Sequence, residues 1–341
     1  WLFTILTYEV MFMNKSIRVL IVGFGVVGQG FFELFHRVKD ELGLGNALIS
    51  EIVDIKYGHI KDPKPSIIED IKAGKTMGEK ITPDDIPRII EESNADIMGE
   101  FTWVNIKTRG EPAFTYLSSA IKSGKHVITT NKGPIAFHYD ELMELSKRYD
   151  KLVRFKGTVM AGTPSFNILK LLPGAHIEYF MGILNGTTNF ILSKMYEEGL
   201  SFDEALKLAQ QLGYAEADPS LDIDGIDAAL KVVITSRVIG WRHGFENIEV
   251  KGIRDIDIKR YGDKVVKLIA YADKDKAYVK PTPLEKGDIL AHVSRNLNAL
   301  RFKLDTLGEL LVIGPGAGRF ETAQAALTDL VDIINTAGLN R

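Results

Sequence analysis

An aspartate and a lysine one helical turn apart are the residues best placed to do chemistry in this chain. Asp227 and Lys231 stand at positions i and i+4 of a predicted helix, so their side chains share one face. On a solvated surface such a pair would be an ordinary ion pair worth about 0.3–0.5 kcal/mol. The segment 227–234, DAALKVVI, is however apolar on most sides, as in a helix buried nearly all round. A desolvated Lys231 beside Asp227 could donate a proton or a hydrogen bond to a carbonyl oxygen.

The stretch before this helix holds the densest cluster of polar side chains in the chain. The cluster consists of Tyr214, Glu216, Asp218, Asp222 and Asp224. Carboxylates at this place could hold the ammonium group of a substrate while a lysine acts on an oxygen of the same molecule.

A second polar motif precedes an apolar helix. It reads Asn185-Gly186-Thr187-Thr188-Asn189 and supplies free backbone N–H groups, hydroxyls and amides at a helix start. Gly186 and Thr187 lie where these free N–H groups are expected. The motif is either a plain helix cap or a cradle for an anion or another polar ligand.

A glycine motif follows the first predicted strand and opens a helix. The motif G-x-G-x-x-G spans Gly23, Gly25, Val26, Val27 and Gly28. In this context the missing side chains let the backbone approach a pyrophosphate, whose charge then faces the helix N-terminus. The alternative is a tight turn between strand and helix without a ligand.

Other residues at the carboxyl ends of predicted strands could contact a dinucleotide. Asp54 could accept a hydrogen bond from a ribose hydroxyl, whereas Lys56 could meet a 2′-phosphate, so the choice between NAD and NADP stays open. Thr102 directly follows the predicted strand 95–101. Lys132 follows the strand 126–130 and could reach cofactor or substrate, although a lysine at such a place is often a solvated surface charge.

The elements that must position these residues alternate between strand and helix. Apolar runs at 17–22, 48–53, 95–101 and 126–130 alternate with predicted helices at 26–41, 112–123 and 139–149. This alternation predicts an α/β fold with a doubly wound, Rossmann-type dinucleotide-binding domain. The segment 58–87 is rich in Lys, Asp, Pro and Gly and looks like a connection with short helices.

After about residue 150 the pattern changes to strands at 152–155, 177–184 and 249–252 separated by long helices. One helix begins with a capping box at Ser201 and Glu204, and Gly213 ends it. We therefore expect a dinucleotide-binding domain over residues 15–150 and an α+β domain over 151–307. Residues 308–341 are expected to return to the first domain, and residues 1–14 to form an N-terminal extension.

The composition excludes several functional classes. The chain has 341 residues, a formal net charge of -3 and no cysteine. Charges of both signs are interspersed, so we expect no nucleic-acid partner. Absence of cysteine rules out thiolate catalysis and disulfides. The apolar run 1–13 is interrupted by Glu9 and is too short to cross a bilayer, so we expect no membrane partner and a cytoplasmic protein.

Four stretches resemble the signatures of the homoserine dehydrogenase family. They read TTNKGPIA, LNGTTNFIL, AQQLGYAEADPSLDIDGIDAALK and GPGAGRFETA. The similarity in order and spacing runs from about residue 17 to 333. The third stretch is long and specific to the family. The G-x-G-x-x-G motif alone would not identify the family.

The resemblance implies an NAD(P)-dependent oxidoreductase that interconverts L-homoserine and L-aspartate 4-semialdehyde. It implies that Lys231 exchanges a proton with the substrate oxygen and that Lys132 lies between nicotinamide and substrate. Positions that hold the amino-acid substrate match Glu216 and Asp227, with Tyr214 and Asp222 as neighbours. Cofactor contacts match Gly213, Gly316 and Gly318.

The resemblance also suggests a sodium-type ion held by main-chain oxygens in the turn 156–163. Candidate ligands are Val159, Ala161 and Thr163. Lys156 stands where the family usually has a glutamate, and a cation beside an ammonium is electrostatically disfavoured. A bound metal is therefore not a firm expectation.

Family members form homodimers through the sheet of the second domain, and we expect the same here. Regulated members carry a further C-terminal domain or a fused kinase, and we expect neither in this short form. Two other readings remain. One is a related reductase of another small polar aldehyde or hydroxy acid, and the other is a protein that senses NAD(H) without turnover.

Overall fold

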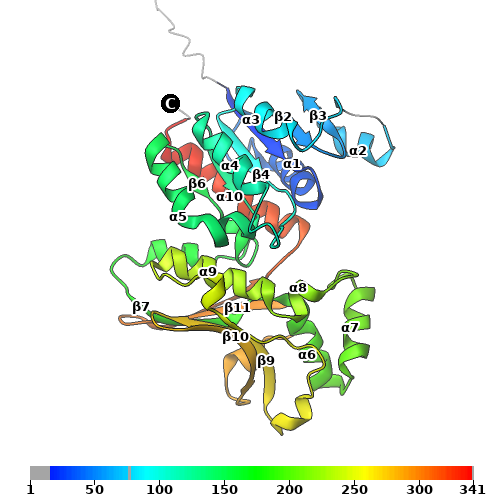
Figure 1. Cartoon of the computed structure of the whole chain (residues 1–341), viewed down its shortest axis with the longest axis vertical. Coiled ribbons are helices and arrows are strands. Elements are labelled where there is room, and N and C mark those ends of the chain that lie inside the picture. Colours follow the sequence, from blue (N-terminus) through cyan, green and yellow to red (C-terminus); the bar gives the residue numbers. More distant parts are fainter. Residues whose placement is uncertain (1–15, 76–77, 340–341) are drawn as a thin grey trace, which may run out of the picture.

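The computed structural model describes residues 16–75 and 78–339. The described residues form two six-stranded sheets, each with its own helices, stacked along the long axis of the molecule (Figure 1). The expected α/β class with a Rossmann-type domain is confirmed. The expected extension at residues 1–14 lies outside the described residues.

The first sheet has the strand order β3-β2-β1-β4-β5-β6. The central strand β1 is buried on both faces because its side chains alternate between two helical layers. Val19 and Ile21 pack towards α1 and α10, whereas Leu20 and Val22 pack towards α3, α4 and α5. The elements of the first part of the chain are β1 (Ile17–Val22), α1 (Val26–Val38), β2 (Ala47–Asp54), β3 (Gly58–Lys61), α2 (Ile67–Lys72), α3 (Asp85–Glu92), β4 (Ile97–Glu100), α4 (Ala113–Lys122), β5 (His126–Thr129), α5 (Lys132–Tyr149) and β6 (Val153–Arg154).

Ligands of such sheets bind where the strand order reverses. Here β2 and β4 lie on opposite sides of β1, and all three run parallel. The carboxyl ends of β1 and β4 therefore bring Gly23 and the loop that begins at Thr102 to the edge of the sheet where such folds bind their ligands.

One part of the first domain differs from the expectation. The segment 58–87 contains β3, which pairs antiparallel with β2, and the buried residues Ile67 and Ile68 of α2. The sequence pattern concealed this strand because it is only four residues long and has a mixed polar composition. The sheet is thus parallel except at this edge.

The second sheet has the order β12-β11-β7-β9-β10-β8 and is antiparallel except for the pair of β8 with β10. The helices α6 and α9 pack on it, and α9 lies between this sheet and α5 of the first domain (Figure 1). The elements of this part are β7 (Ile177–Ile183), α6 (Gly186–Glu198), α7 (Phe202–Gln211), α8 (Ser220–Ile223), α9 (Ile226–Ile239), β8 (Glu249–Val250), β9 (Val265–Asp273), β10 (Ala277–Leu284), β11 (Leu297–Leu304) and β12 (Gly308–Pro315).

The chain returns to the first domain later than residue 308. The strand β12 pairs with β11 in the second sheet, and only α10 (Arg319–Thr336) packs against α1. The expected boundary at 308 therefore falls one strand too early. An apolar strand pattern shows that a strand forms, but not which of two sheets it joins.

Two local predictions in the second part are confirmed. Ser201 and Glu204 form the capping box of α7, and Gly213 follows that helix with a φ of 75°. The helix α9 is buried over nine consecutive residues, Ala228 to Ser236, as its apolar sequence indicated. Among the helices of the described segments, none has the length and apolar character that crossing a bilayer would need.

Candidate active site

The pair Asp227–Lys231 lies in the first two turns of α9, on the side that faces the first domain. Lys231 is 5 % exposed, and its Nζ lies 2.8 Å from Asp227 Oδ2. The same ammonium donates a hydrogen bond to the carbonyl oxygen of Leu184 at 2.5 Å. Two of its three N–H bonds thus have partners among the described residues, so one more acceptor can be bound.

A second lysine reaches the same carboxylate from the first domain. Lys132 begins α5, directly after β5, and its Nζ lies 3.3 Å from Asp227 Oδ1. Asn131 caps this helix by accepting a hydrogen bond from the Gly133 N–H. Asp227 therefore bridges two ammonium groups that belong to different domains, and Lys132 is not a solvated surface charge.

The charges around Asp227 decide its protonation state. Burial alone would raise the pKa of Asp227, but the ammonium groups of Lys231 and Lys132 outweigh burial and hold that pKa below its usual range. Asp227 is consequently ionised at neutral pH. Burial, and then the negative charge of Asp227, raise the pKa of the neighbouring carboxyl Asp222.

The motif at the start of α6 holds these two carboxyl groups. Asn185 caps α6, and its amide donates to Asp222 Oδ1 at 2.6 Å and to Asp227 Oδ2 at 3.0 Å. Thr187 Oγ1 lies 2.6 Å from the carbonyl oxygen of Tyr214 and 2.8 Å from Asp222 Oδ2. One hydroxyl hydrogen serves only one of these acceptors, so a protonated Asp222 would complete the pattern, in agreement with its raised pKa. The motif is therefore both a helix cap and part of the site.

These groups line one cavity of about 650 Å³ between the two domains. All of the residues proposed from sequence for substrate and catalysis border it, together with three of the cofactor glycines. They are Lys132, Gly186, Thr187, Gly213, Tyr214, Glu216, Asp222, Asp227, Lys231, Gly316 and Gly318.

The glycine motif forms a tight turn that fits a dinucleotide. Gly23 has a φ of 89°, and a Cβ there would lie 2.7 Å from the carbonyl carbon of Phe101. A Cβ at Gly28 would lie 2.2 Å from the Gly23 oxygen. Gly25 by contrast faces open space, which a pyrophosphate can fill at the N-terminus of α1. Val26 and Val27 form the first turn of that helix, and Val26 is exposed.

A groove beside this turn contains Asp54 and Lys56. The Asp54 carboxylate accepts hydrogen bonds from the N–H groups of Phe24 at 2.7 Å and of Lys56 at 2.8 Å, so it fixes the turn. The Lys56 ammonium lies over the Tyr57 ring, 5.0 Å from its centroid. Arg319, at the start of α10, lines the same groove and adds a second cation. Arg319 was not proposed from the sequence. Its position directly after the last glycine turn was the only feature that could have indicated a cofactor contact.

Thr102 lines neither the main cavity nor the groove at Asp54. Its N–H donates to Glu100 Oε1 at 2.8 Å, and its hydroxyl is bonded to the same carboxylate. Glu100 is fully buried, and burial raises its pKa. Thr102 thus anchors the start of the loop whose next residue, Trp103, borders the main cavity. Trp103 and Asn296 were not proposed from sequence, because nothing in their local pattern marks a cavity wall.

The turn proposed for a cation does not fit one well. The Val159 carbonyl already accepts a hydrogen bond from the Ser165 hydroxyl at 3.0 Å, and the Lys156 ammonium lies 3.5 Å from the buried Asp329 carboxylate. The Lys156 side chain, paired with Asp329, therefore lies at the start of the turn that carries Ala161 and Thr163. In residues 16–75 and 78–339, no three His, Cys, Asp or Glu side chains gather as metal ligands would.

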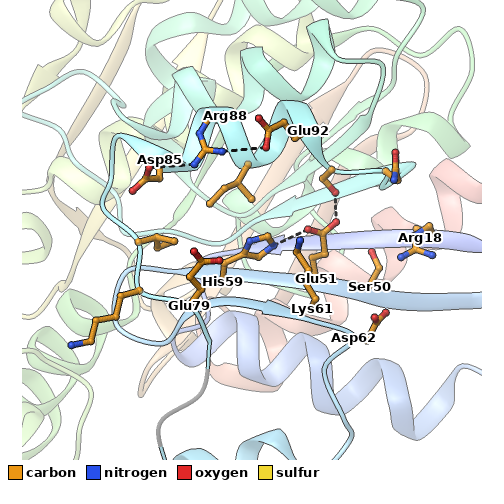
Figure 2. A pocket seen from close by; sticks show the side chains of 15 residues that line it. Arg18, Ser50, Glu51, His59, Lys61, Asp62, Glu79, Asp85, Arg88 and Glu92 are labelled. Atoms are coloured by element: carbon orange, nitrogen blue, oxygen red, sulfur yellow. Dashed lines mark hydrogen bonds and ion pairs between the residues drawn. The ribbon is translucent and has the colours of Figure 1, made fainter.

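A second cavity, of about 360 Å³, lies at the far edge of the first sheet between β1, β2, β3 and α3 (Figure 2). None of the residues proposed for function lines it. Its buried carboxylate Glu51 is bonded to His59 Nε2 at 2.8 Å and to the Ser93 hydroxyl. These bonds join β2 to β3 and to the end of α3, so Glu51 stabilises the fold at this edge of the sheet.

The fold and the site together define an NAD(P)-dependent oxidoreductase that acts on a CH–OH group. The glycine turn and the groove beside it can bind the dinucleotide, and the buried lysine at the domain boundary can exchange a proton with an oxygen atom.

Comparisons with known proteins define the family. The model of the homoserine dehydrogenase NAD-binding domain matches residues 23–156, and the homoserine dehydrogenase model matches residues 164–331. The homoserine dehydrogenase of Sulfurisphaera tokodaii is 38% identical over 92% of this chain and 97% of its own length. The NAD(+)-dependent homoserine dehydrogenase of Pseudomonas canavaninivorans is 37% identical over 94% of this chain and 97% of its own.

Solved structures agree with these relatives. A hyperthermophilic archaeal homoserine dehydrogenase in complex with NADPH superposes with a TM-score of 0.82 at 31% identity, covering 94% of this chain and 98% of that one. The homoserine dehydrogenase of Thiobacillus denitrificans has a TM-score of 0.80 at 32% identity, and the match covers 95% of this chain and 75% of that one. The chain belongs to the homoserine dehydrogenase family.

Proposed function

We propose that this chain catalyses the reversible reduction of L-aspartate 4-semialdehyde to L-homoserine. The observation that carries the proposal is the buried Lys231 ammonium, held by Asp227 and by the Leu184 carbonyl at the wall of the interdomain cavity. A charge on a buried helix is costly unless it has a task or a partner. Here it has a partner and one N–H left for a ligand.

Bound NADH or NADPH supplies the hydride that the aldehyde carbon accepts. The chain would hold this cofactor with the turn at Gly23, Gly25, Val26, Val27 and Gly28 and with Lys132, Gly213, Gly316 and Gly318. Thr102 would act indirectly, by fixing the loop that carries Trp103. Asp54 would bind a ribose hydroxyl of NADH, or Lys56 the 2′-phosphate of NADPH, in the groove that both line. Both cofactors occur among the relatives, since one is NAD(+)-dependent and another was solved with NADPH.

The substrate binds between the cluster before α9 and the start of α6. Glu216, exposed on the cavity wall, faces its ammonium group, and Tyr214, Asp222 and Asp227 complete that side. Gly186 and Thr187 offer the first N–H groups of α6 to its carboxylate. This arrangement would reject aldehydes that lack the amino-acid group.

Lys231 moves the proton. As the hydride reaches the aldehyde carbon, the Lys231 ammonium donates one proton to the oxygen, so the carbonyl becomes a hydroxyl and the lysine a neutral amine that regains a proton from water. In the oxidative direction the amine accepts that proton. Lys132, on the other oxygen of Asp227, adds positive charge where the alkoxide develops.

We further propose a cytoplasmic homodimer, with each sheet and its helices as one domain. The second sheet carries an aromatic row on the strands β7, β9 and β10. Tyr271 stacks on Tyr179 at 5.7 Å and on Tyr278 at 4.9 Å between ring centroids. Tyr271 alternates with the buried Ala270 and Ala272, so it lies on the face opposite α9. Such a face suits a second copy, and a mass of one chain by light scattering would contradict the dimer.

A turnover assay tests the proposed function. Purified protein is mixed with L-homoserine and NAD⁺ or NADP⁺, and the absorbance of the reduced cofactor is followed. L-serine, L-threonine and L-malate serve as competing hydroxy compounds. We expect turnover with homoserine far above that with the others. Turnover only with another hydroxy acid, or cofactor binding without turnover, would remove the proposal.

A further inference from the structure

A buried lysine outside the cavity has no role in the chemistry described so far. Lys267, on β9, is 2 % exposed, and the hydrogen-bond partners of its ammonium among the described residues are all neutral. The Glu197 carboxylate acts on it only through its charge, which opposes the effect of burial on the Lys267 pKa. A buried charge without a counterion is costly, and an apolar side chain of similar volume often serves a core equally well or better. The lysine therefore calls for an explanation.

The Lys267 ammonium has three neutral acceptors, one for each of its N–H bonds. They are Asn189 Oδ1 at 2.9 Å, Ser193 Oγ at 3.0 Å and the Val293 carbonyl oxygen at 2.7 Å. The first two belong to α6 and the third to the segment before β11. Burial lowers the pKa of Lys267 to about 8, which leaves the ammonium form predominant at neutral pH.

Asn189 doubles the same connection. Its amide donates to the carbonyl oxygens of Val293 at 3.1 Å and of Leu297 at 3.0 Å. Lys267 and Asn189 thus fasten α6 to the segment 293–297, and we call this set of bonds the α6 anchor. It accounts for Asn189, a polar residue of the LNGTTNFIL stretch that does not line the cavity.

The two fastened segments form adjoining walls of the interdomain cavity. Asn296 lines the cavity, and a Cβ at Gly186 would lie 2.6 Å from the Asn296 carbonyl oxygen, so the start of α6 touches this segment directly. Leu297 then pairs with Pro315, the residue before the glycine turn at Gly316. The α6 anchor therefore sets the spacing between the residues that hold substrate and the turn that borders the cofactor.

We propose that Lys267 is a positioning residue that, through the α6 anchor, holds Asn185, Gly186 and Thr187 at the spacing that amino-acid substrate binding requires. The inference rests on the proposed function of the cavity. Lys267 touches neither substrate nor cofactor. Its charge fixes three acceptors at once, which a neutral side chain of the same length cannot do.

The test compares K267M with N189L, which breaks the α6 anchor from its other side, and with L268A. Leu268 is buried on the opposite face of β9, so L268A loosens the same strand without touching the anchor. A fourth variant, K264M, removes an exposed lysine that pairs with Glu285 at 2.8 Å. For each variant, KM for homoserine, kcat, the dissociation constant of NADPH and the melting temperature are measured.

We expect K267M and N189L each to raise KM for homoserine about tenfold, equivalent to about 1.4 kcal/mol. The NADPH dissociation constant should stay within about twofold, because the turns at Gly23 and Gly316 follow strands whose pairing does not depend on the anchor. The double variant should show less than the product of the single effects, since both break one set of bonds. L268A should lower the melting temperature with KM unchanged, and K264M should match wild type.

A wild-type KM in K267M, or a KM change in L268A equal to that in K267M at the same loss of stability, overturns the proposal. If K267M does not fold, N189L serves as the test instead. An unchanged KM for homoserine in N189L then overturns the proposal. Absence of homoserine turnover in the wild-type protein would instead count against the proposed function, so the two failures are distinguishable.

Discussion

The substitution D227N tests the electrostatic core of the site. Asparagine keeps the shape of the side chain and an oxygen acceptor, but it removes the negative charge that lies 2.8 Å from the Lys231 ammonium and 3.3 Å from that of Lys132. At an effective dielectric constant of about 20, each pair is attracted by about 5–6 kcal/mol before desolvation is subtracted. Removing one member of such a buried pair leaves a net loss of about 3–5 kcal/mol.

The loss should appear in both stability and rate. Burial works against the charged form of Asp227, yet the two ammonium groups hold its pKa below the usual 3.8, so the stabilisation is present above that value and is lost only as the pH falls through the lower folded-state pKa. At about pH 7 the wild type therefore has the full contribution. Without the carboxylate, the ammonium groups of Lys132 and Lys231 repel each other, and their side chains are no longer held in the orientation seen here. We expect kcat for semialdehyde reduction to fall by about 10²–10⁴.

The assay combines urea unfolding with saturating kinetics of semialdehyde reduction at neutral pH. D224N is the matched control, because Asp224 pairs with Arg254 at 2.8 Å at an exposed site outside the cavity. The control should lose less than about 1 kcal/mol. A D227N enzyme with kcat within threefold of wild type would refute the assigned role of the two ion pairs.

Three further predictions concern the cofactor groove and a buried acid. G25V should fold as wild type does, since no atom lies within 4 Å of a Cβ at Gly25, but should weaken NADPH binding more than tenfold in a fluorescence titration, and unchanged binding would contradict a pyrophosphate at this turn. K56A should weaken NADPH more than NADH, because only NADPH carries the 2′-phosphate, and equal losses would remove Lys56 from that role. Burial raises the pKa of Asp329 to about 7 from 3.8, so its contribution to stability is full below about pH 4 and is lost as the pH rises to about 7; D329N should therefore gain in melting temperature relative to wild type between about pH 5 and pH 8, and a constant difference would contradict this account.

The sequence predicted those features that depend on local pattern. The glycine turn, the capping box at Ser201 and the buried helix around Lys231 each follow from residues a few positions apart, and all lie where expected. The pairing of Asp227 with Lys231 follows from helix geometry in the same way.

Features that depend on contacts between distant segments escaped prediction. Nothing local shows that Lys132 reaches Asp227 across the domain boundary, that β12 joins the second sheet, or that Asn296 borders the cavity. The buried position of Lys267 is likewise set by α6 and the segment 293–297, which are distant in sequence. Such contacts exist only once the chain has folded, and periodicity cannot reveal them.

The role of Lys231 as proton donor is tested most directly by K231A. The kcat for semialdehyde reduction and the NADPH dissociation constant are measured on the same preparation, with K207A, an exposed lysine of α7, as the control. We predict a fall in kcat of about 10²–10⁴ with cofactor affinity within about twofold, and no change in K207A. A K231A enzyme that reduces the semialdehyde at the wild-type rate would contradict the assignment.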